Sequence, residues 1–434
     1  MVLTCKFLKK TSDIFIRPVF AGLFLLYTFF ITPNNLKADY YPTVINIEVI
    51  GLDRTKQYIV DREILHPLNS QIDSTLANLD RNRIFNLGLF DNVAWRLVPL
   101  ENGNAKLQFI MIESINRTPP LIFPSYDEEK GWSLNGLLIL KNFQGKNRSI
   151  ELNTSFGGEK RIQLLFNDPW LFGDHISLST YIENNSYEHL FLDQSINVNN
   201  IRMSIGKWYG ENIKLRFSPT ITQKVYANKL DTLEYSYFIP ELKFEFDTRD
   251  IFWNPKKGLR IIQSFIPMLG ENEFHIWNQS FSLFLPYSKT VTLALNTTMQ
   301  KKYGYKNDVW INYFGNSFNI RGWKLPKKGS SLDNFRFGHE FIFSSFEVRK
   351  IVLSEKASGL GLSKGLCFVG FIDGGVINKN WDDINMDNLI GGAGIGVRIP
   401  VPILQSVRVD IGWGIKNKIF NKNYAVHLAI QQKF

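Results

Sequence analysis

One arginine and one aspartate stand out as charged groups in apolar, glycine-rich surroundings. Arg321 lies between Ile320 and the pair Gly322 and Trp323, in a stretch whose aromatic, Gly and Asn content predicts a loop. Asp373 lies in the apolar, glycine-bounded segment 370–375. A guanidinium stays charged and offers paired donors, so an enclosed space that holds both groups favours an ion pair between them. Taken alone, Arg321 would be interpreted as a solvated loop charge beside a turn glycine.

The sequence lacks the patterns typical of covalent catalysis or of a bound cofactor. Its six histidines are scattered without metal-ligand spacing, and neither a G-x-S-x-G elbow nor a Walker loop occurs. Cys5 and Cys367 have no metal-site spacing either. The net charge of +10 comes without a basic and aromatic cluster, so it indicates surface charge that could meet anionic lipid headgroups. We therefore expect no catalytic residue, metal, cofactor or nucleic-acid partner.

Residues 1–38 have the pattern of a secretory signal peptide. Lys6, Lys9, Lys10 and Arg17 precede an apolar run over 19–31 and a polar end at 36–38. The run is shorter than the roughly 20 residues that a spanning helix needs. Export is therefore favoured over a single membrane anchor.

A small α+β domain is predicted over 39–116. Alternating strands are expected at 44–50, 90–98 and 105–112, and helices at 59–65 and 72–87. Ile72, Leu76, Leu79 and Ile84 are spaced for one apolar face of the second helix.

From 117 to 434 the sequence predicts an all-β transmembrane barrel of about 16 antiparallel strands, from 121–127 to 424–434. Over 407–415 the odd positions are apolar, while the even positions are charged or glycine. Lipid outside and water inside require such alternation, and a closed sheet leaves no unpaired edge in the hydrocarbon. The alternative is a soluble sandwich whose apolar face is turned inward.

Several segments, in order, resemble the BamA/TamA family of outer-membrane assembly barrels (the bacterial surface antigen superfamily). Two are signature segments: Ile320, Arg321, Gly322 and Trp323 form the first, and Phe371, Asp373 and Gly375 belong to the second. Others are 87–93, 136–145, 167–173, 246–250, 255–258, 391–398 and 408–410. The resemblance implies that Arg321 tips a long loop folded back into the lumen and meets Asp373 on the wall. It also implies that 39–116 is a single POTRA domain in the periplasm.

The first and last barrel strands must pair to close the cylinder. Three prolines, including Pro124, lie in 118–125, and none can donate a ladder hydrogen bond. We therefore expect a weak seam that opens and lends its edge to an incoming strand; the alternative is a proline-rich entry from the linker with no gating role. Phe434, after alternating apolar residues, resembles the insertion signal of outer-membrane barrels, or else anchors at the membrane interface.

The function implied by this resemblance is assembly of outer-membrane proteins. The expected partners are unfolded outer-membrane protein clients, membrane lipid and periplasmic accessory proteins. Two alternatives remain open: a two-partner-type translocation pore, and a passive channel or receptor. A single POTRA domain leaves open whether the protein is a main assembly machine or a specialised relative.

Overall fold

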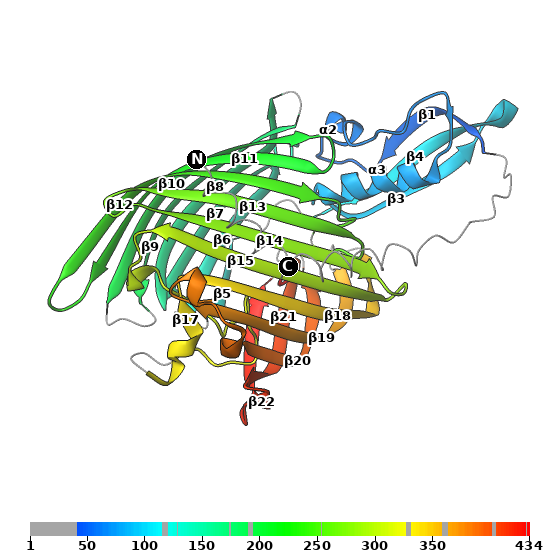
Figure 1. Ribbon diagram of the computed structural model, residues 1–434. Helices are drawn as coiled ribbons and strands as arrows, with labels where there is room; N and C mark the ends of the chain where they lie inside the picture. The colour runs from blue at the N-terminus through cyan, green and yellow to red at the C-terminus, as the bar shows by residue number, and fades with distance from the viewer. Residues whose placement is uncertain are drawn as a thin grey trace, which may run out of the picture. The chain divides into compact units, whose positions relative to one another are not determined.

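The computed structural model describes residues 41–114, 120–127, 129–172, 175–189, 194–252, 254–326, 331–357, 363–401, 405–430 and 432–434. The predicted signal peptide lies outside these residues. They form a small α+β sheet and a large β-barrel, each described by itself below (Figure 1). Within the described residues, no helix is long and apolar enough to cross a membrane.

The α+β part has the predicted order of strand, helix, helix, strand, strand, with one added short strand. Its elements are β1 (Thr43–Ile50), α2 (Gln57–Asp61), β2 (Ser70–Gln71), α3 (Ser74–Asn86), β3 (Phe90–Pro99) and β4 (Asn104–Glu113), with a 3-10 turn at Glu101–Gly103. The sheet order is β2-β1-β4-β3, in which β1 and β4 run parallel. Apolar residues of both helices and of β1, β3 and β4 form one buried core.

Helix α3 differs from the prediction in the face that it buries. Asp73 caps its N-terminus, since the side chain accepts hydrogen bonds from the backbone N–H groups of Thr75 (2.8 Å) and Leu76 (3.1 Å). The helix then buries Ala77, Asp80 and Ile84, whereas Leu79 is 45% exposed. The predicted apolar face was therefore wrong at Leu79.

Asp80 explains the rotation of the helix. Its carboxylate accepts hydrogen bonds from the backbone N–H groups of Leu65 and His66, both at 3.0 Å, and pairs with Arg83. A buried carboxylate is tolerated when such donors surround it. Hydrophobic spacing alone could not show that a charged residue takes a core position.

The barrel begins at the predicted residue. Its strands are β5 (Leu121–Asp127), β6 (Gly131–Phe143), β7 (Arg148–Gly157), β8 (Glu159–Phe172), β9 (Ile176–Glu188), β10 (Ser195–Tyr209), β11 (Ile213–Ala227), β12 (Thr232–Asp247), β13 (Gly258–Gly270), β14 (Phe274–Pro286), β15 (Val291–Gly304), β18 (Glu340–Ala357), β19 (Ser363–Asn378), β20 (Ile390–Val401), β21 (Gln405–Lys416), β22 (Ile419–Phe420) and β23 (Ala425–Ile430). Both β22 and β23 pair with β21. Taken as one interrupted strand, they give sixteen strands over the described residues, which confirms the expected barrel.

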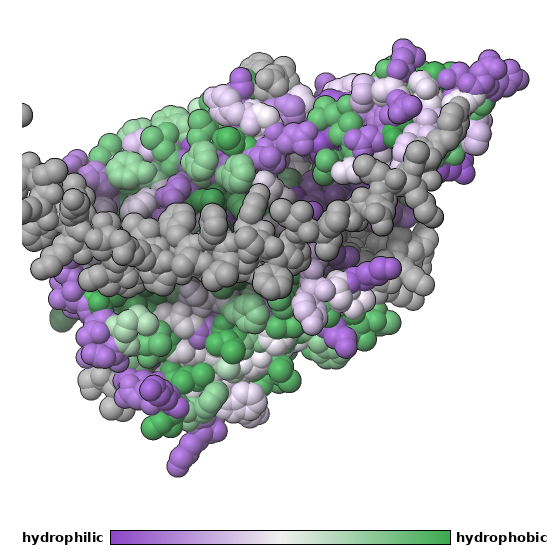
Figure 2. Space-filling model, turned by 45° about the vertical axis from the view of Figure 1, so that its right-hand side comes forward, coloured by the Kyte–Doolittle hydropathy of each residue, from purple (hydrophilic) through white to green (hydrophobic). Residues whose placement is uncertain are grey.

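The two faces of the barrel wall differ in polarity as predicted. On β21, Arg408 and Asp410 are fully buried, whereas Ile411 and Trp413 are each 37% exposed. Figure 2 shows hydrophobic residues over the visible part of the barrel wall. Inside, the wall from β7 to β12 lines a polar cavity of about 400 Å³ with residues that include Arg202, Arg216 and Lys243. Apolar side chains therefore face outward and polar ones face the lumen.

A ladder of amides marks one edge of the outward apolar band. Asn184 donates to Asn199 (2.7 Å), Asn199 to Gln223 (3.2 Å), and Gln223 to Glu234 (2.6 Å), across β9 to β12. Large apolar side chains such as Ile201 and Ile221 lie two residues from this ladder along their strands, on the same outer face. Amides and a carboxylate need water or one another, so the hydrocarbon ends at this level.

The last strand is shorter than predicted. The expectation was a strand over 424–434, but β23 ends at Ile430, and residues 432–434 are not in a strand. Lys433 instead turns into the barrel, where its ammonium lies 3.0 Å from the Asp373 carboxylate. The ion pair with this buried carboxylate holds the Lys433 side chain inside the barrel.

The orientation of the barrel wall gives a first prediction. Leu152 is outward-facing on β7, and the neighbouring Asn153 faces inward and donates to Gln163. We expect Leu152→Arg to destabilise the barrel by about 2–4 kcal/mol in lipid, as for an arginine near the bilayer midplane. The matched Asn153→Arg substitution should cost much less. Urea unfolding in liposomes compares them, and equal costs would contradict the orientation.

A second prediction concerns Glu113, whose carboxylate accepts backbone hydrogen bonds from Asp53 (3.1 Å), Arg54 (3.2 Å) and Thr55 (2.9 Å). Burial alone would raise the pKa of Glu113, but these hydrogen bonds outweigh it and hold the pKa below its usual value. A lowered pKa stabilises the fold above the unfolded value of about 4.3, and this contribution is lost as pH falls through the folded pKa.

Hydrogen exchange at residues 53–55, corrected for intrinsic rates, measures this loss. We expect protection to fall on acidification in the wild type, and to be weak at every pH in Glu113→Gln. The exposed Glu101→Gln is the control and should behave as the wild type does. A Glu113→Gln protein with the wild-type pH profile would rule out the carboxylate as the cause.

Candidate functional site: a loop bound inside the barrel

The chain between β15 and β18 is a long loop with its own local structure. It contains the strands β16 (Asn312–Tyr313) and β17 (Phe337–Gly338), which pair, and 3-10 turns at Asp308–Trp310 and Ser331–Arg336. Asn319 shapes its apex: the side-chain oxygen accepts from the N–H groups of Gly315 (2.8 Å) and Asn316 (3.1 Å), and the amide donates to the Tyr313 carbonyl (2.9 Å). These bonds present the next residues, Ile320 and Arg321, to the wall.

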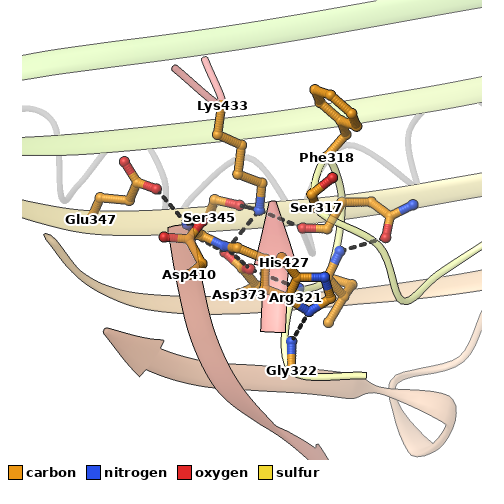
Figure 3. A network of polar contacts seen from close by, with 12 residues as sticks. Ser317, Phe318, Arg321, Gly322, Ser345, Glu347, Asp373, Asp410, His427 and Lys433 are labelled. Carbon is orange, nitrogen blue, oxygen red and sulfur yellow. Dashed lines mark hydrogen bonds and ion pairs between the residues drawn. The ribbon is translucent and has the colours of Figure 1, made fainter. Parts of the chain in front are cut away.

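Arg321 is fully buried and binds Asp373 on β19 with three donors (Figure 3). Its Nε donates to Oδ2 at 2.8 Å, its Nη2 to Oδ1 at 2.9 Å, and its backbone N–H to Oδ2 at 3.0 Å. This bidentate geometry with an added backbone bond fixes both the position and the direction of the side chain. The structure thus brings together the two residues singled out first in the sequence.

Two further carboxylates hold the same guanidinium. Nη1 of Arg321 donates to Glu347 on β18 at 2.7 Å and to Asp410 on β21 at 3.2 Å. The ring of Phe371, one of the predicted wall residues, lies under the guanidinium, with 3.6 Å from Cζ to the ring centroid. Residues from three strands therefore converge on one loop arginine.

Other buried cations surround these carboxylates. Arg349 and Arg398 both contact Glu347, at 2.8 and 3.4 Å. Arg398 also donates to Asp410, and Arg408 donates to the Ser317 carbonyl at 2.7 Å. With Lys433 on Asp373, the group is an extended network in which each carboxylate serves two or more cations. Charges out of contact with water need such pairing.

Glycines allow the loop to approach the wall this closely. Gly322 has φ +89°, and a Cβ there would lie 2.5 Å from the Trp413 carbonyl carbon. On the wall, a Cβ at Gly392 would lie 1.8 Å from the Arg321 carbonyl oxygen. Only glycine is compatible with either position.

The remaining predicted loop residues also contact the wall or the loop's own core. The backbone N–H of Gly322 donates to Nε2 of His427 on β23 at 2.9 Å, and Nε1 of Trp323 donates to the Gly391 carbonyl at 2.7 Å. Ile320 is fully buried in an apolar cluster with Phe314, Phe343, Ile377 and Ile390.

Gly375 has a packing role rather than a contact with Arg321. A Cβ at this position would lie 2.5 Å from Cβ of Phe343 on the neighbouring strand. The glycine therefore makes room for that ring within the apolar cluster.

The two residues expected at the seam do not come together. Pro124 is exposed on the outer face of β5 beside Ile122, which is 73% exposed. Phe434 instead lies inside the barrel, where its ring is 4.9 Å from Cζ of Arg349 and 6.1 Å from the ring of Phe284. The predicted lipid-facing or interfacial place for Phe434 was therefore wrong.

Several residues of the network were not predicted as site residues. Glu347, Arg398, His427 and Lys433 are among them, although the alternation of the last strand places Lys433 on the same face as His427. The signal available in the sequence was their parity, because charged residues at alternate positions of apolar strands must face a polar lumen. Whether a position is odd or even along the strand shows which face of the sheet its side chain lies on, but not how far along the barrel it lies. The network depends on both.

The network has the properties of a structural lock. Among the described residues no cluster of His, Cys, Asp or Glu could hold a metal ion. Each carboxylate near Arg321 is already engaged by cations, so the arrangement can position a loop and resist its removal.

Fold and site together define a transmembrane β-barrel whose own loop is bound inside its lumen. A profile of the Omp85 superfamily domain matches residues 142–434. The chain belongs to the Omp85 superfamily.

Several solved structures share this fold. BamA from Haemophilus ducreyi lacking POTRA domains 1–3 has a TM-score of 0.56 at 16% identity, over 90% of this chain and 83% of that one. CdiB from Escherichia coli has 0.55 at 12%, over 93% and 92%. CdiB from Acinetobacter baumannii has 0.54 at 11%, over 90% and 74%. No curated protein sequence gave a match.

The lock gives a third prediction. We expect Arg321→Ala to release the loop apex, because it leaves Asp373 and Glu347 buried with fewer cations, at a cost of roughly 3–5 kcal/mol for a desolvated pair. Lys324→Ala, three residues along the same loop, should have little effect. Limited proteolysis of the loop in folded protein reports the release. Equal protection in both variants would show that the ion pair does not hold the loop.

Proposed function

We propose that this protein inserts and folds outer-membrane β-barrel proteins. In this proposal residues 39–116 form a single POTRA domain in the periplasm that receives unfolded clients, and the seam between β5 and β23 templates their strands. The observation that carries the proposal is the shortness of the two seam strands.

The seam between β5 and β23 has few residues that can pair. β5 has 7 residues and β23 has 6, whereas the other full strands of the wall have 10 to 18. Pro124 within β5 has no N–H to donate. Each ladder bond contributes on the order of 1 kcal/mol net, so closure at this seam is weaker than the pairing between two full strands of the wall.

An opened seam would provide the physical requirements for client folding. Its free edge presents unpaired backbone groups, which a client strand satisfies by adding to the sheet. The outward residues of the seam, such as Ile122 and Leu428, are apolar and exposed, so the client's apolar face can meet lipid as it pairs. Client recognition would thus use backbone hydrogen bonds and tolerate varied sequences.

The bound loop argues against a passive channel or receptor. Arg321 and its partners lie inside the barrel, fully buried, so the lumen beside β18 to β21 is occupied by protein. Steady, large conductance would require the loop to leave, which breaks several buried ion pairs.

A two-partner-type translocation pore is the second candidate. The structural similarity to CdiB from Escherichia coli nearly equals that to BamA, so fold alone does not choose between them. A translocator would require the loop to move and would have an exported partner protein as its substrate. An insertase requires only the seam to open.

The deciding experiment locks the seam. In a background without the native cysteines, cysteine pairs between 122–125 and 425–429 are screened for a disulfide that joins β5 to β23. The reconstituted protein is then tested for its ability to speed insertion of an unfolded barrel client into liposomes. We expect the locked form to lose this activity and to regain it on reduction.

A matched control locks a different pair of strands. Leu138 on β6 lies directly opposite Leu152 on β7, and a disulfide there should leave insertion unchanged. Full activity of the seam-locked protein would eliminate the templating mechanism. Secretion of an exoprotein without any insertion activity would instead support the translocator.

A further inference from the structure

We propose that the loop between β15 and β18 is a clasp across the barrel seam, and that Lys433 is the positioning residue that fastens the last strand to it. The inference rests on the proposed function, because it identifies the contacts that control the same seam. It comes from three groups of contacts, which join the loop to both strands beside the seam.

The first group ties the loop to the last strand and the residues after it. The N–H of Gly322 donates to Nε2 of His427 on β23 at 2.9 Å. Beyond β23, the ammonium of Lys433 lies 3.0 Å from Asp373 and donates to the Asn319 carbonyl and the Ser345 hydroxyl (Figure 3). Its side chain is only 1% exposed, so all three ammonium donors are used by protein.

The second group ties the loop to the other side of the seam. The hydroxyl of Tyr313 donates to the carboxylate of Glu129, in the turn between β5 and β6. The same hydroxyl accepts a hydrogen bond from the Asn316 side chain at 3.2 Å. This bond fixes the Tyr313 hydroxyl relative to the loop apex. The turn itself is fixed by Asp127, whose side chain accepts from the backbone N–H groups of Glu129 and Lys130. The loop therefore contacts β23 on one side of the seam and the turn that follows β5 on the other.

The third group of contacts is at Asp373, which binds both Arg321 of the loop and Lys433 near the end of the chain. Its Oδ1 accepts from Nη2 of Arg321 at 2.9 Å and lies 3.0 Å from the ammonium of Lys433. One buried carboxylate thus holds the loop arginine and the end of the last strand together. Removing either cation changes the electrostatic environment of the other, so loop position and strand position are coupled.

The sequence beside β5 explains why the end of the last strand turns inward. In a barrel with an even number of antiparallel strands, the residues after Ile430 run toward the start of β5. Pro119 and Pro120 precede that start and cannot donate ladder bonds. A tail with fewer ladder donors beside it gains more from the ion pair with Asp373. Lys433 therefore replaces the missing end of the seam with a contact to the loop.

The two sides of the clasp differ in strength. The side chains of Lys433 and His427 are buried, while the Tyr313–Glu129 hydrogen bond is exposed. A buried charge pair is costly to break, and an exposed hydrogen bond is not. The clasp should therefore yield first at Tyr313, and the β5–β6 side should move while β23 stays with the loop.

Spin labels on the outer face test the clasp without any client. With the native cysteines replaced by serine, the full chain in liposomes carries a label at Ile122→Cys on β5 or, as a distant site, at Ile162→Cys on β8; the two parent side chains are 73% and 63% exposed. We expect Lys433→Met to raise the mobile fraction at position 122 about tenfold, since losing a buried pair shifts an equilibrium by at least that factor. Position 162 should not change.

Two further variants keep the test decisive. Tyr313→Phe removes the opposite, exposed side of the clasp, does not threaten folding, and should mobilise position 122 as well. Lys433→Arg keeps the charge and should restore most of the rigidity. Lys422→Met, an exposed lysine just before β23, is the matched control and should have no effect.

The outcomes separate the clasp from the proposed function. An unchanged label at position 122 in both Lys433→Met and Tyr313→Phe overturns the clasp, whatever the insertion activity. A mobilised label also at position 162 overturns it too, because the effect would be general loosening. A label mobilised at 122 alone supports the clasp, and unaltered client insertion in the same variants would then count against the proposed function only.

Discussion

The structure depends on a single constraint: a charged arginine on a loop has been removed from water and must be neutralised by the barrel wall. Arg321 meets this requirement with Asp373, Glu347 and Asp410, which come from three different strands. None of these strands could shift along its neighbours without breaking a contact. The loop and the register of β18 to β21 thus stabilise each other, and the network costs far more to disrupt than surface ion pairs do.

The other half of the barrel is built differently. The wall from β7 to β12 carries polar residues around an open space. The first strand of the barrel, β5, is short. Stability is therefore unevenly distributed: the loop-bound side is held by buried charges, and the seam is held by few ladder bonds. Under the proposed function, this asymmetry would let the seam open while the loop-bound side stays folded.

Much of the fold could be predicted from the sequence because the barrel's physical environment imposes a simple rule. Alternation over 407–415 correctly placed Arg408 and Asp410 inside and Ile411 and Trp413 outside. The start of the barrel at Leu121 was also predicted to the residue. The partnership of Arg321 with Asp373 followed from charge in apolar surroundings together with the family resemblance.

The rest required three-dimensional information. Alternation assigns His427 to the inner face, but its contact with Gly322 depends on where the loop apex stops. Alternation likewise places Lys433 on the inner face, but its ion pair with Asp373 depends on the position of a distant strand. In the α+β part, Asp80 takes a core place because backbone donors from another segment surround it. Each case is a polar contact between distant segments, for which local periodicity contains no signal.

The most direct measurement is a double-mutant cycle on unfolding in liposomes, with Arg321→Ala, Asp373→Ala and both together. If the pair holds the loop inside the barrel, the two single substitutions are each costly, and the double variant costs less than their sum by a coupling energy of about 0.5–3 kcal/mol. Strictly additive costs would mean that the two residues act independently, and the loop would then be held by something other than this ion pair.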